Sequence, residues 1–311
     1  MSNYDLRKGV IYCSIGVFLI GLQPVIANSR PKTIDPIIFG GVTALIEALI
    51  FMPFYFIERK TIKKENRSIS LLNGWKKKRN LFLLFGIGLV FSAIPIMLYI
   101  GYEIAGAINS SLALKSEIVV ALLFGFLLLN ERISKIQIFF CFTLFLGLFL
   151  AITEGFKYIV SFDFGVLIIL ISVILFTFIH ALTKISFNRD ELFPSQVVFI
   201  RNLVSGILIT LIYIIIFPLE NLKLIFYEYN FLFFLMMGID YGFSLYVWYK
   251  ALSYIEIGKA TIIISFTPIV SSFFSFLWLG ENFTLFHLIG MSIIILSIIM
   301  IVKMKKESSP T

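Results

Sequence analysis

Apolar residues fall into long runs separated by short polar segments along the whole chain. Each run is about 20 residues long, the length a helix needs to cross a hydrocarbon core of about 30 Å. The pattern predicts ten membrane-spanning helices, at residues 8–27, 36–57, 80–102, 106–129, 134–153, 163–185, 194–217, 230–254, 258–279 and 284–303. The sequence therefore predicts an all-α membrane protein.

Composition agrees with this prediction, because 59% of the residues are hydrophobic and 14% are charged. A soluble domain is usually about 45–50% apolar and about 25% charged. The net charge of +8 could suggest a nucleic-acid partner, but the lysines and arginines gather in the segments between apolar runs, where they act as topology signals. Two cysteines inside apolar runs and two widely separated histidines predict neither a disulfide framework nor a metal site, and we expect no cofactor.

The distribution of positive charge predicts the orientation. If the N-terminus is inside, most lysines and arginines lie in cytoplasmic segments, so both termini are predicted to be cytoplasmic at the cell (inner) membrane. The longest connection, "ERKTIKKENRSISLLNGWKKKR", joins the second and third spans. It is interpreted as an orientation signal, and contact with anionic lipids is the alternative.

An internal repeat appears when the chain is compared with itself at an offset of 150 residues. "VVALLFGFLLLNE" then aligns with "IVSSFFSFLWLGE" without a gap, so that Glu131 matches Glu281 and Tyr99 matches Tyr249. Residues 1–153 and 154–311 are predicted to form two repeats of five spans each. Because five is odd, the second repeat would enter the membrane inverted, an arrangement typical of secondary transporters with a substrate site near the midplane.

These features resemble the EamA-like family of the drug/metabolite transporter superfamily. The shared elements are the Leu-x-Glu turns in "LLLNERIS" and "LWLGENFT" and the second-repeat segment "ATIIISFTPIVSSFFSFLWLGE", in which Pro268 lies mid-helix. Arg201 fits an arginine often found in the seventh helix of the family, whereas the first repeat has Ile118 in place of the proline. The resemblance implies alternating access around a central cavity whose walls draw heavily on helices 3, 4, 8 and 9.

Charged residues inside the predicted spans are the strongest candidates for substrate binding, because a charge at that depth costs at least about 2.5–3.5 kcal/mol. Glu117 is expected to attract a cationic group or carry a proton, and structural pairing is its alternative. For Lys115, pairing with Glu47 and binding of a substrate carboxylate are both open. Asp240, near the middle of the eighth span, is a second acidic candidate or a hydrogen-bonded core carboxylate.

Aromatic and polar residues near these charges complete the predicted binding site. Carboxylates combined with aromatic faces favour ammonium groups. The aromatic candidates are Tyr99, Tyr102, Tyr241, Tyr246 and Trp248, although an interfacial belt would also explain them.

Two polar residues beside prolines that are expected to interrupt their helices join the set, namely Gln23, beside Pro24, and Ser265, near Pro268. A packing kink at Pro24 is the alternative for the first. His180 is expected to be a core histidine, with a proton relay as the alternative. Glu131 and Glu281 are assigned to structure, each favouring the N-terminal dipole of the following helix, with Ser134 and Gln137 forming a capping box.

The sequence thus predicts a secondary transporter that moves a small metabolite, with export of amino acids or related amines as the first hypothesis. Import or exchange of a quaternary amine, a nucleotide-sugar or a sugar phosphate is the alternative. An intramembrane enzyme is disfavoured, because no nucleophile–base set or metal cluster is visible in the sequence. The expected partners are a small-molecule substrate and membrane lipids, and coupling of transport to a proton is left open.

Overall fold

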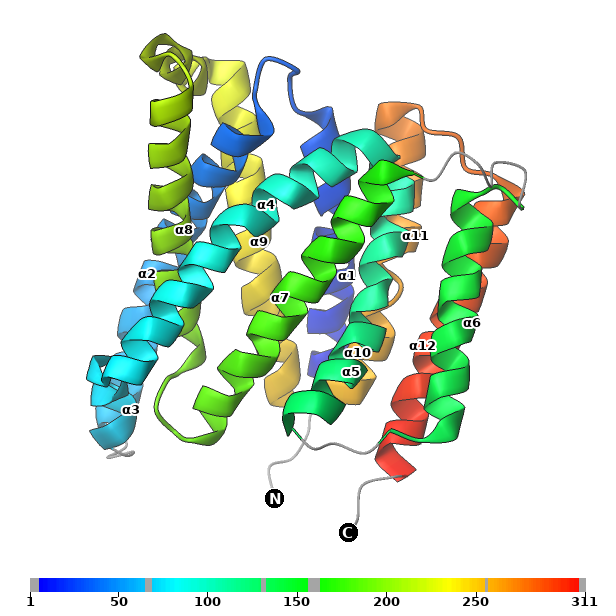
Figure 1. Ribbon diagram of the computed structural model, residues 1–311, viewed down its shortest axis with the longest axis horizontal. Helices are drawn as coiled ribbons and strands as arrows, with labels where there is room; N and C mark the ends of the chain where they lie inside the picture. Colours follow the sequence, from blue (N-terminus) through cyan, green and yellow to red (C-terminus); the bar gives the residue numbers. More distant parts are fainter. Residues whose placement is uncertain (1–5, 65–68, 130–132, 156–162, 255–256, 308–311) are drawn as a thin grey trace. The chain divides into compact units, whose positions relative to one another are not determined.

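The computed structural model describes residues 6–64, 69–129, 133–155, 163–254 and 257–307. Within these ranges all regular structure is helical, as predicted. The α-helices are α1 (Leu6–Ser29), α2 (Pro36–Lys64), α3 (Ile69–Asn73), α4 (Lys78–Ala113), α5 (Glu117–Leu129), α6 (Lys135–Ile152), α7 (Phe164–Asn188), α8 (Pro194–Ile216), α9 (Glu228–Tyr254), α10 (Ile257–Ile264), α11 (Thr267–Phe274) and α12 (Leu285–Glu307) (Figure 1). Shorter 3₁₀ or π segments are η1 (Gly74–Lys76), η2 (Leu114–Ser116), η3 (Leu219–Phe226) and η4 (Ser275–Leu279).

Nine helical stretches in the described residues are long and apolar enough to cross a membrane. One of them, Lys78–Leu128, has 51 residues, more than twice the length that a single span requires. Gly106, with φ 76° and ψ 166°, breaks this stretch where the sequence predicts the boundary between the third and fourth spans. The predicted count of ten spans stays a prediction.

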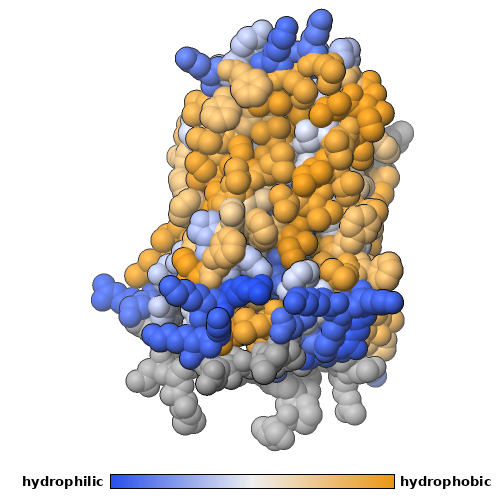
Figure 2. Space-filling view, turned by 90° about the vertical axis from the view of Figure 1, so that its left-hand side faces the viewer, coloured by the Kyte–Doolittle hydropathy of each residue, from blue (hydrophilic) through white to orange (hydrophobic). Residues whose placement is uncertain are grey.

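The surface carries many large apolar side chains, among them Phe82, Ile215 and Phe142, which are 78, 82 and 72% exposed. Figure 2 shows one face on which hydrophobic residues cover the middle and hydrophilic residues gather towards the two ends. Soluble monomers rarely expose apolar surface this continuously. The exposed side chains are therefore the lipid-facing surface of a multi-pass membrane protein.

The chain forms two compact units that interleave along the sequence. Unit 1 comprises Met1–Ser29, Ile100–Ile174 and Phe243–Thr311, and unit 2 comprises Arg30–Tyr99 and Leu175–Gly242. Each unit draws on both predicted repeats. The repeat boundaries at 153/154 stay a prediction.

In unit 1, α6 packs along α12, and α1 packs against α10 and α11. Glycines allow these close approaches, since a Cβ on Gly290 would lie 2.7 Å from the Cβ of Ala151, and one on Gly21 would lie 2.7 Å from the Cβ of Val270. Small residues at helix crossings are the usual means of packing in a membrane, where no hydrophobic force drives helices together. α1 begins and α12 ends at the same, lower end of this unit (Figure 1).

In unit 2, α2 packs along α8. A Cβ on Gly206 would lie 2.8 Å from Cγ of Leu45, so this crossing also depends on a missing side chain. Towards one end, Leu84, Ile87, Ile179, Leu192 and Val197 form a buried cluster. The cluster joins the start of α4 to the end of α7 and the start of α8.

Candidate functional site

Polar groups in unit 1 gather at a break in the predicted ninth span. α10 ends at Ile264 and α11 begins at Thr267, so the interruption expected around Pro268 is present. Proline has no N–H, and the carbonyl of Ile264, four residues earlier, therefore lacks its helical donor. Nζ of Lys115 lies 3.5 Å from this oxygen and donates to it. The ammonium group occupies the negative end of α10, where a cation is favourable.

Glu117 begins α5, directly after the 3₁₀ turn Leu114–Ser116. Its side chain is exposed, although it belongs to the longest apolar helical stretch among the described residues. Its charge interacts with that of Lys115. Among the described residues of unit 1, neither a hydrogen bond nor an ion pair engages the carboxylate.

Gln23 and Ser244 contact each other inside unit 1, with Nε2 of Gln23 donating to Oγ of Ser244 at 3.2 Å. α1 continues through Pro24, so the helical interruption expected there is not seen. Both side chains are buried, at 7 and 4% exposure. The Gln23 amide is therefore a buried polar contact between α1 and α9.

Tyr102 is 1% exposed, and its carbonyl accepts a hydrogen bond from Nδ2 of Asn28 at 2.7 Å. Ser265 is also buried, and its hydroxyl donates to the carbonyl of Ile262 at 2.6 Å. The carbonyl of Tyr102 thus joins α4 to α1, whereas the hydroxyl of Ser265 bonds within the turn that ends α10. Binding of a substrate by Ser265 would require its hydroxyl to leave the carbonyl of Ile262.

The aromatic residues of α9 in unit 1 have two different surroundings. Trp248 packs against a cluster of Cys13, Ala251 and Ala260. The ring of Tyr246 lies 5.7 Å from Nζ of Lys250, which indicates that this ring can accept a cation. The side chain of Tyr249 lies outside the described residues.

Unit 2 contains a buried charge pair that the sequence analysis did not predict. Nη2 of Arg201 on α8 lies 3.4 Å from Oε1 of Glu47 on α2, and Nε of Arg201 donates to Oδ1 of Asn202 at 2.9 Å. The guanidinium lies 4.3 Å from the ring centre of Phe91. The sequence does contain a signal for this pair, because Glu47 and Arg201 carry opposite charges and each lies inside a predicted span.

The other predicted residues of unit 2 are Tyr99, Asp240 and Tyr241. Tyr99 is 2% exposed, packs on Phe39 at 4.8 Å between ring centres, and approaches Oγ1 of Thr43 at 3.4 Å. Asp240 is 5% exposed, whereas Tyr241 is partly exposed. Tyr99 and Asp240 are thus buried within their unit.

His180 does not occupy the core position expected from the sequence, because its side chain is exposed. Its ring lies 6.1 Å from Phe91 and 5.6 Å from Phe176, measured between ring centres. Aromatic contacts hold the ring on the surface of α7. Within the described ranges no group of three or more His, Cys, Asp or Glu side chains could hold a metal ion.

The carboxylate of Glu281 caps the helix that follows Gly106. Oε1 accepts a hydrogen bond from the amide of Ala107 at 2.7 Å, and Oε2 accepts one from Ile108 at 3.0 Å. The structural role expected for Glu281 fits this geometry, but the helix it caps is not the one that follows it in sequence. The capping box of Ser134 and Gln137 is confirmed, whereas Glu131 lies outside the described residues.

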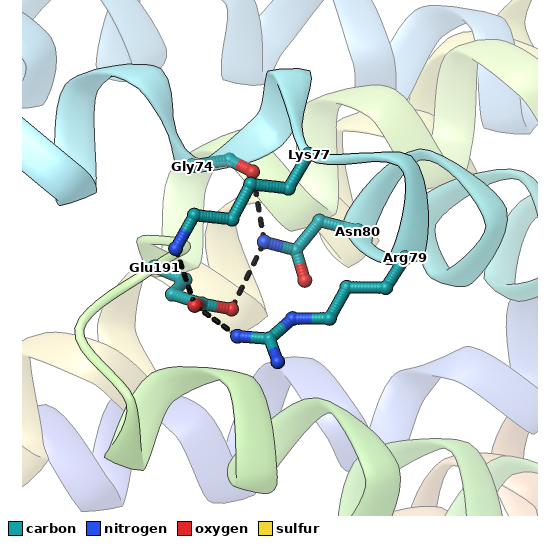
Figure 3. A network of polar contacts seen from close by, with 5 residues as sticks. All are labelled: Gly74, Lys77, Arg79, Asn80 and Glu191. Carbon is teal, nitrogen blue, oxygen red and sulfur yellow. Dashed lines mark hydrogen bonds and ion pairs between the residues drawn. The ribbon is translucent and has the colours of Figure 1, made fainter.

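Glu191, outside the membrane spans, is the centre of a second polar network (Figure 3). Its carboxylate accepts from Nζ of Lys77 at 2.7 Å, from Nδ2 of Asn80 at 3.1 Å and from Nη2 of Arg79. The hydrogen bond from Lys77, followed by those from Asn80 and Arg79, lowers the pKa of Glu191 from 4.5 to about 2, against the opposing effect of burial. The network ties the α7–α8 connection to the turn before α4, where a Cβ on Gly74 would collide with the carbonyl of Glu191.

The ten predicted site residues are divided between the two units. Unit 1 contains Lys115, Glu117, Gln23, Tyr102, Tyr246, Trp248 and Ser265, and unit 2 contains Tyr99, Asp240 and Tyr241. Lys115 and Ser265 lie at the broken helix of unit 1, because Lys115 contacts the residue that precedes Ser265. Their role in binding stays a prediction.

Comparison with known proteins adds independent evidence. The model of the EamA-like transporter family matches residues 7–153 and again residues 163–303. An uncharacterised transporter of Bacillus subtilis (strain 168), YoaV, is 24% identical over 275 residues, which cover 86% of this chain and 87% of that protein. A solved crystal structure covers 98% of this chain with a TM-score of 0.64 and 13% identity, which supports the fold alone. The two matches span nearly the whole polypeptide, and the chain belongs to the EamA-like transporter family of the drug/metabolite transporter superfamily.

Proposed function

We propose that this transporter exports amino acids or related amines across the cell membrane by alternating access, with both termini in the cytoplasm. A substrate of this class carries an ammonium group, which a carboxylate inside the membrane would attract. The proposal also includes a proton that is taken up by the same carboxylate when the substrate leaves. Intramembrane acidic residues commonly serve both purposes in transporters.

The observation that carries the proposal is the state of Glu117. Three other carboxylates have partners within the protein, because Glu281 caps a helix, Glu47 pairs with Arg201 and Glu191 accepts three hydrogen bonds. Glu117 is exposed and begins a helix within an apolar stretch. A carboxylate in that position is costly unless water or a cation reaches it, which is what a transport pathway provides.

The orientation is supported by two features. α1 begins and α12 ends at the same end of unit 1 (Figure 1), so an even number of crossings separates them. The segment 58–79, which joins the second and third predicted spans, contains nine lysines and arginines, and basic connections are usually cytoplasmic. Cysteines introduced at Ser2 and Ser309 should both react with an impermeant reagent only after the cells are opened.

Counterflow in proteoliposomes tests the function. Vesicles loaded with each amino acid or amine in turn should accumulate the labelled compound, and Glu117→Gln should reduce uptake at least tenfold and remove its pH dependence. Glu220→Gln in η3 removes an exposed carboxylate outside the spans and serves as the control. Normal uptake by Glu117→Gln, with unchanged pH dependence, would contradict the role of this residue. An absence of flux for every compound in the panel would contradict the function.

A phosphate-bearing substrate is the second candidate, and Lys115 favours it. A cation within an apolar stretch can bind phosphate as well as a carboxylate. However, the ammonium group already contacts the carbonyl of Ile264 at 3.5 Å. Counterflow with glycerol 3-phosphate and with a nucleotide-sugar separates this alternative from the first.

A further inference from the structure

The guanidinium of Arg201 lies over an aromatic ring and keeps some of its N–H donors available. The guanidinium carbon lies over the ring of Phe91, 4.3 Å from its centre, and this cation–π contact holds the group in place. The five N–H donors of an arginine lie in the plane of the guanidinium and point outward from its edge. A side chain held in this way is oriented for an acceptor that approaches edge-on.

Only part of this edge is engaged by the protein. Nε donates to Oδ1 of Asn202, and Nη2 lies 3.4 Å from Oε1 of Glu47. Charge-assisted hydrogen bonds are usually about 2.7–2.9 Å long, and arginine–carboxylate pairs are frequently bidentate. Among the described residues of unit 2, Nη1 has no hydrogen-bond partner, and the side chain is 14% exposed. The contact with Glu47 is therefore loose and leaves room for a second acceptor.

Asn202 provides a second donor, which lies beside the same carboxylate of Glu47. Because Nε of Arg201 can only donate, the oxygen of the Asn202 amide must face it, and the amide nitrogen then faces another way. Asn202 is only 3% exposed, and its side chain interacts with the carboxylate of Glu47, but in the described part of the chain Nδ2 has no acceptor at full hydrogen-bond geometry. A buried amide without an acceptor is costly, and ligand oxygens are one way in which it can be satisfied.

We propose that Arg201 and Asn202 form the recognition site for the carboxylate of the transported solute, and that Glu47 holds the guanidinium when the site is empty. The proposal rests on the proposed function and makes the substrate an amino acid rather than a simple amine. A planar carboxylate matches the fork of an arginine. Glu47 and Arg201 together carry no net charge, so a carboxylate with one negative charge suits the site better than a phosphate with two.

Purified protein and matched ligands test the proposal. The ligands are the twenty amino acids, the same compounds as α-amides, the corresponding decarboxylated amines, inorganic phosphate and glycerol 3-phosphate. We expect at least one amino acid to raise the melting temperature, whereas its α-amide and amine bind at least about tenfold more weakly. Equal binding of acid and α-amide would overturn the proposal.

Two substitutions should change binding in opposite directions. Arg201→Gln should weaken binding of the amino acid at least about tenfold, with Arg189→Gln as the control for loss of an exposed positive charge. Glu47→Gln should tighten binding about threefold, because it removes the internal competitor. A purely structural pair would give no gain in affinity for Glu47→Gln, and that result would overturn the proposal. If Arg201→Gln fails to fold, the double variant Glu47→Gln/Arg201→Gln leaves no buried unpaired charge and should still lose the preference for acid over α-amide.

The outcomes also separate this proposal from the proposed function. Transport of amino acids and amines with equal affinity would overturn the carboxylate site and leave the function intact. Binding of phosphate or glycerol 3-phosphate that depends on Arg201, without binding of amino acids, would overturn both the carboxylate assignment and the proposed substrate class. Binding of no compound in the panel would overturn the site.

Discussion

Lys115 donates to the carbonyl of Ile264, the oxygen that Pro268 leaves without a helical donor. A residue of the first predicted repeat thus completes the hydrogen bonding of a broken helix in the second. The contact joins η2 to the end of α10 within unit 1. It gives Lys115 a structural role that is independent of any substrate.

Substitution of Lys115 by methionine should therefore be less costly when Pro268 is also replaced by alanine. Alanine restores the N–H that the carbonyl of Ile264 lacks, so the ammonium group is no longer needed there. We expect a coupling free energy of about 1 kcal/mol between the two sites, measured as the difference in unfolding of the single and double variants in detergent. Lys250→Met, combined with the same proline substitution, should show no coupling. Equal effects of Lys115→Met in both backgrounds would contradict the assigned contact.

Glu281→Ala should destabilise unit 1 by about 1 kcal/mol, because two amides at the start of a helix lose their acceptor. Glu281→Gln should have a smaller effect, since one amide oxygen remains. Thermal unfolding in detergent measures both changes, and Glu228→Gln is the control. Substrate preference should stay the same. A variant that folds normally but prefers another substrate would show that the carboxylate acts in transport.

The Glu191 network should make stability depend on pH in the acid range. The carboxyl group has a pKa of about 2 in the folded protein against an ordinary 4.5, so its contribution is fully present above about pH 4.5. It is lost progressively as the pH falls from about 4.5 towards about 2. The melting temperatures of the wild type and Glu191→Gln should therefore differ by a constant amount between about pH 7 and about pH 5.5, and the difference should shrink below about pH 4.5. A difference that is unchanged at about pH 3 would contradict the network.

His287 should be replaceable by glutamine but not by alanine. Its Nδ1 accepts from the amide of Thr284 at 3.0 Å, and its own amide donates to the Thr284 hydroxyl at 3.3 Å, which makes a capping box for α12. Glutamine can take the same position in such a box, whereas alanine cannot. We expect His287→Ala to cost about 1 kcal/mol of unfolding free energy and His287→Gln less than half of that. Equal costs would show that the contact between Nε2 and Asn109, at 3.2 Å, matters more than the cap.

The sequence predicted the helical class, the approximate spans and the breaks near Gly106 and Pro268, because each depends on local properties. Hydrophobic length determines where a helix can lie in the membrane, and proline removes a specific hydrogen bond. The ends of helices were less predictable. α2 extends to Lys64, beyond its apolar run, because a helix can continue into water once its polar residues reach the surface.

Side-chain partners could not be predicted, because they depend on which helices become neighbours. Glu281 was expected to act on the helix that follows it, yet its acceptor atoms face Ala107 and Ile108, more than 170 positions away. Glu47 was considered as a partner for Lys115 and is found against Arg201. Sequence spacing identifies charges that need a partner in a span. It does not identify the partner.

The interleaving of the two units has a consequence for biosynthesis. Unit 1 combines Met1–Ser29 with Phe243–Thr311, which are the first and last segments to be synthesised. The packing of α1 within this unit can therefore be completed only when translation is nearly finished. Until α10 and α11 emerge, the surface of α1 around Gly21 lacks the helices against which it packs. If translation stalls between the two repeats, this surface of α1 would stay in contact with lipid or with an insertase. We therefore expect truncated chains of this kind to be degraded rather than to accumulate in the membrane.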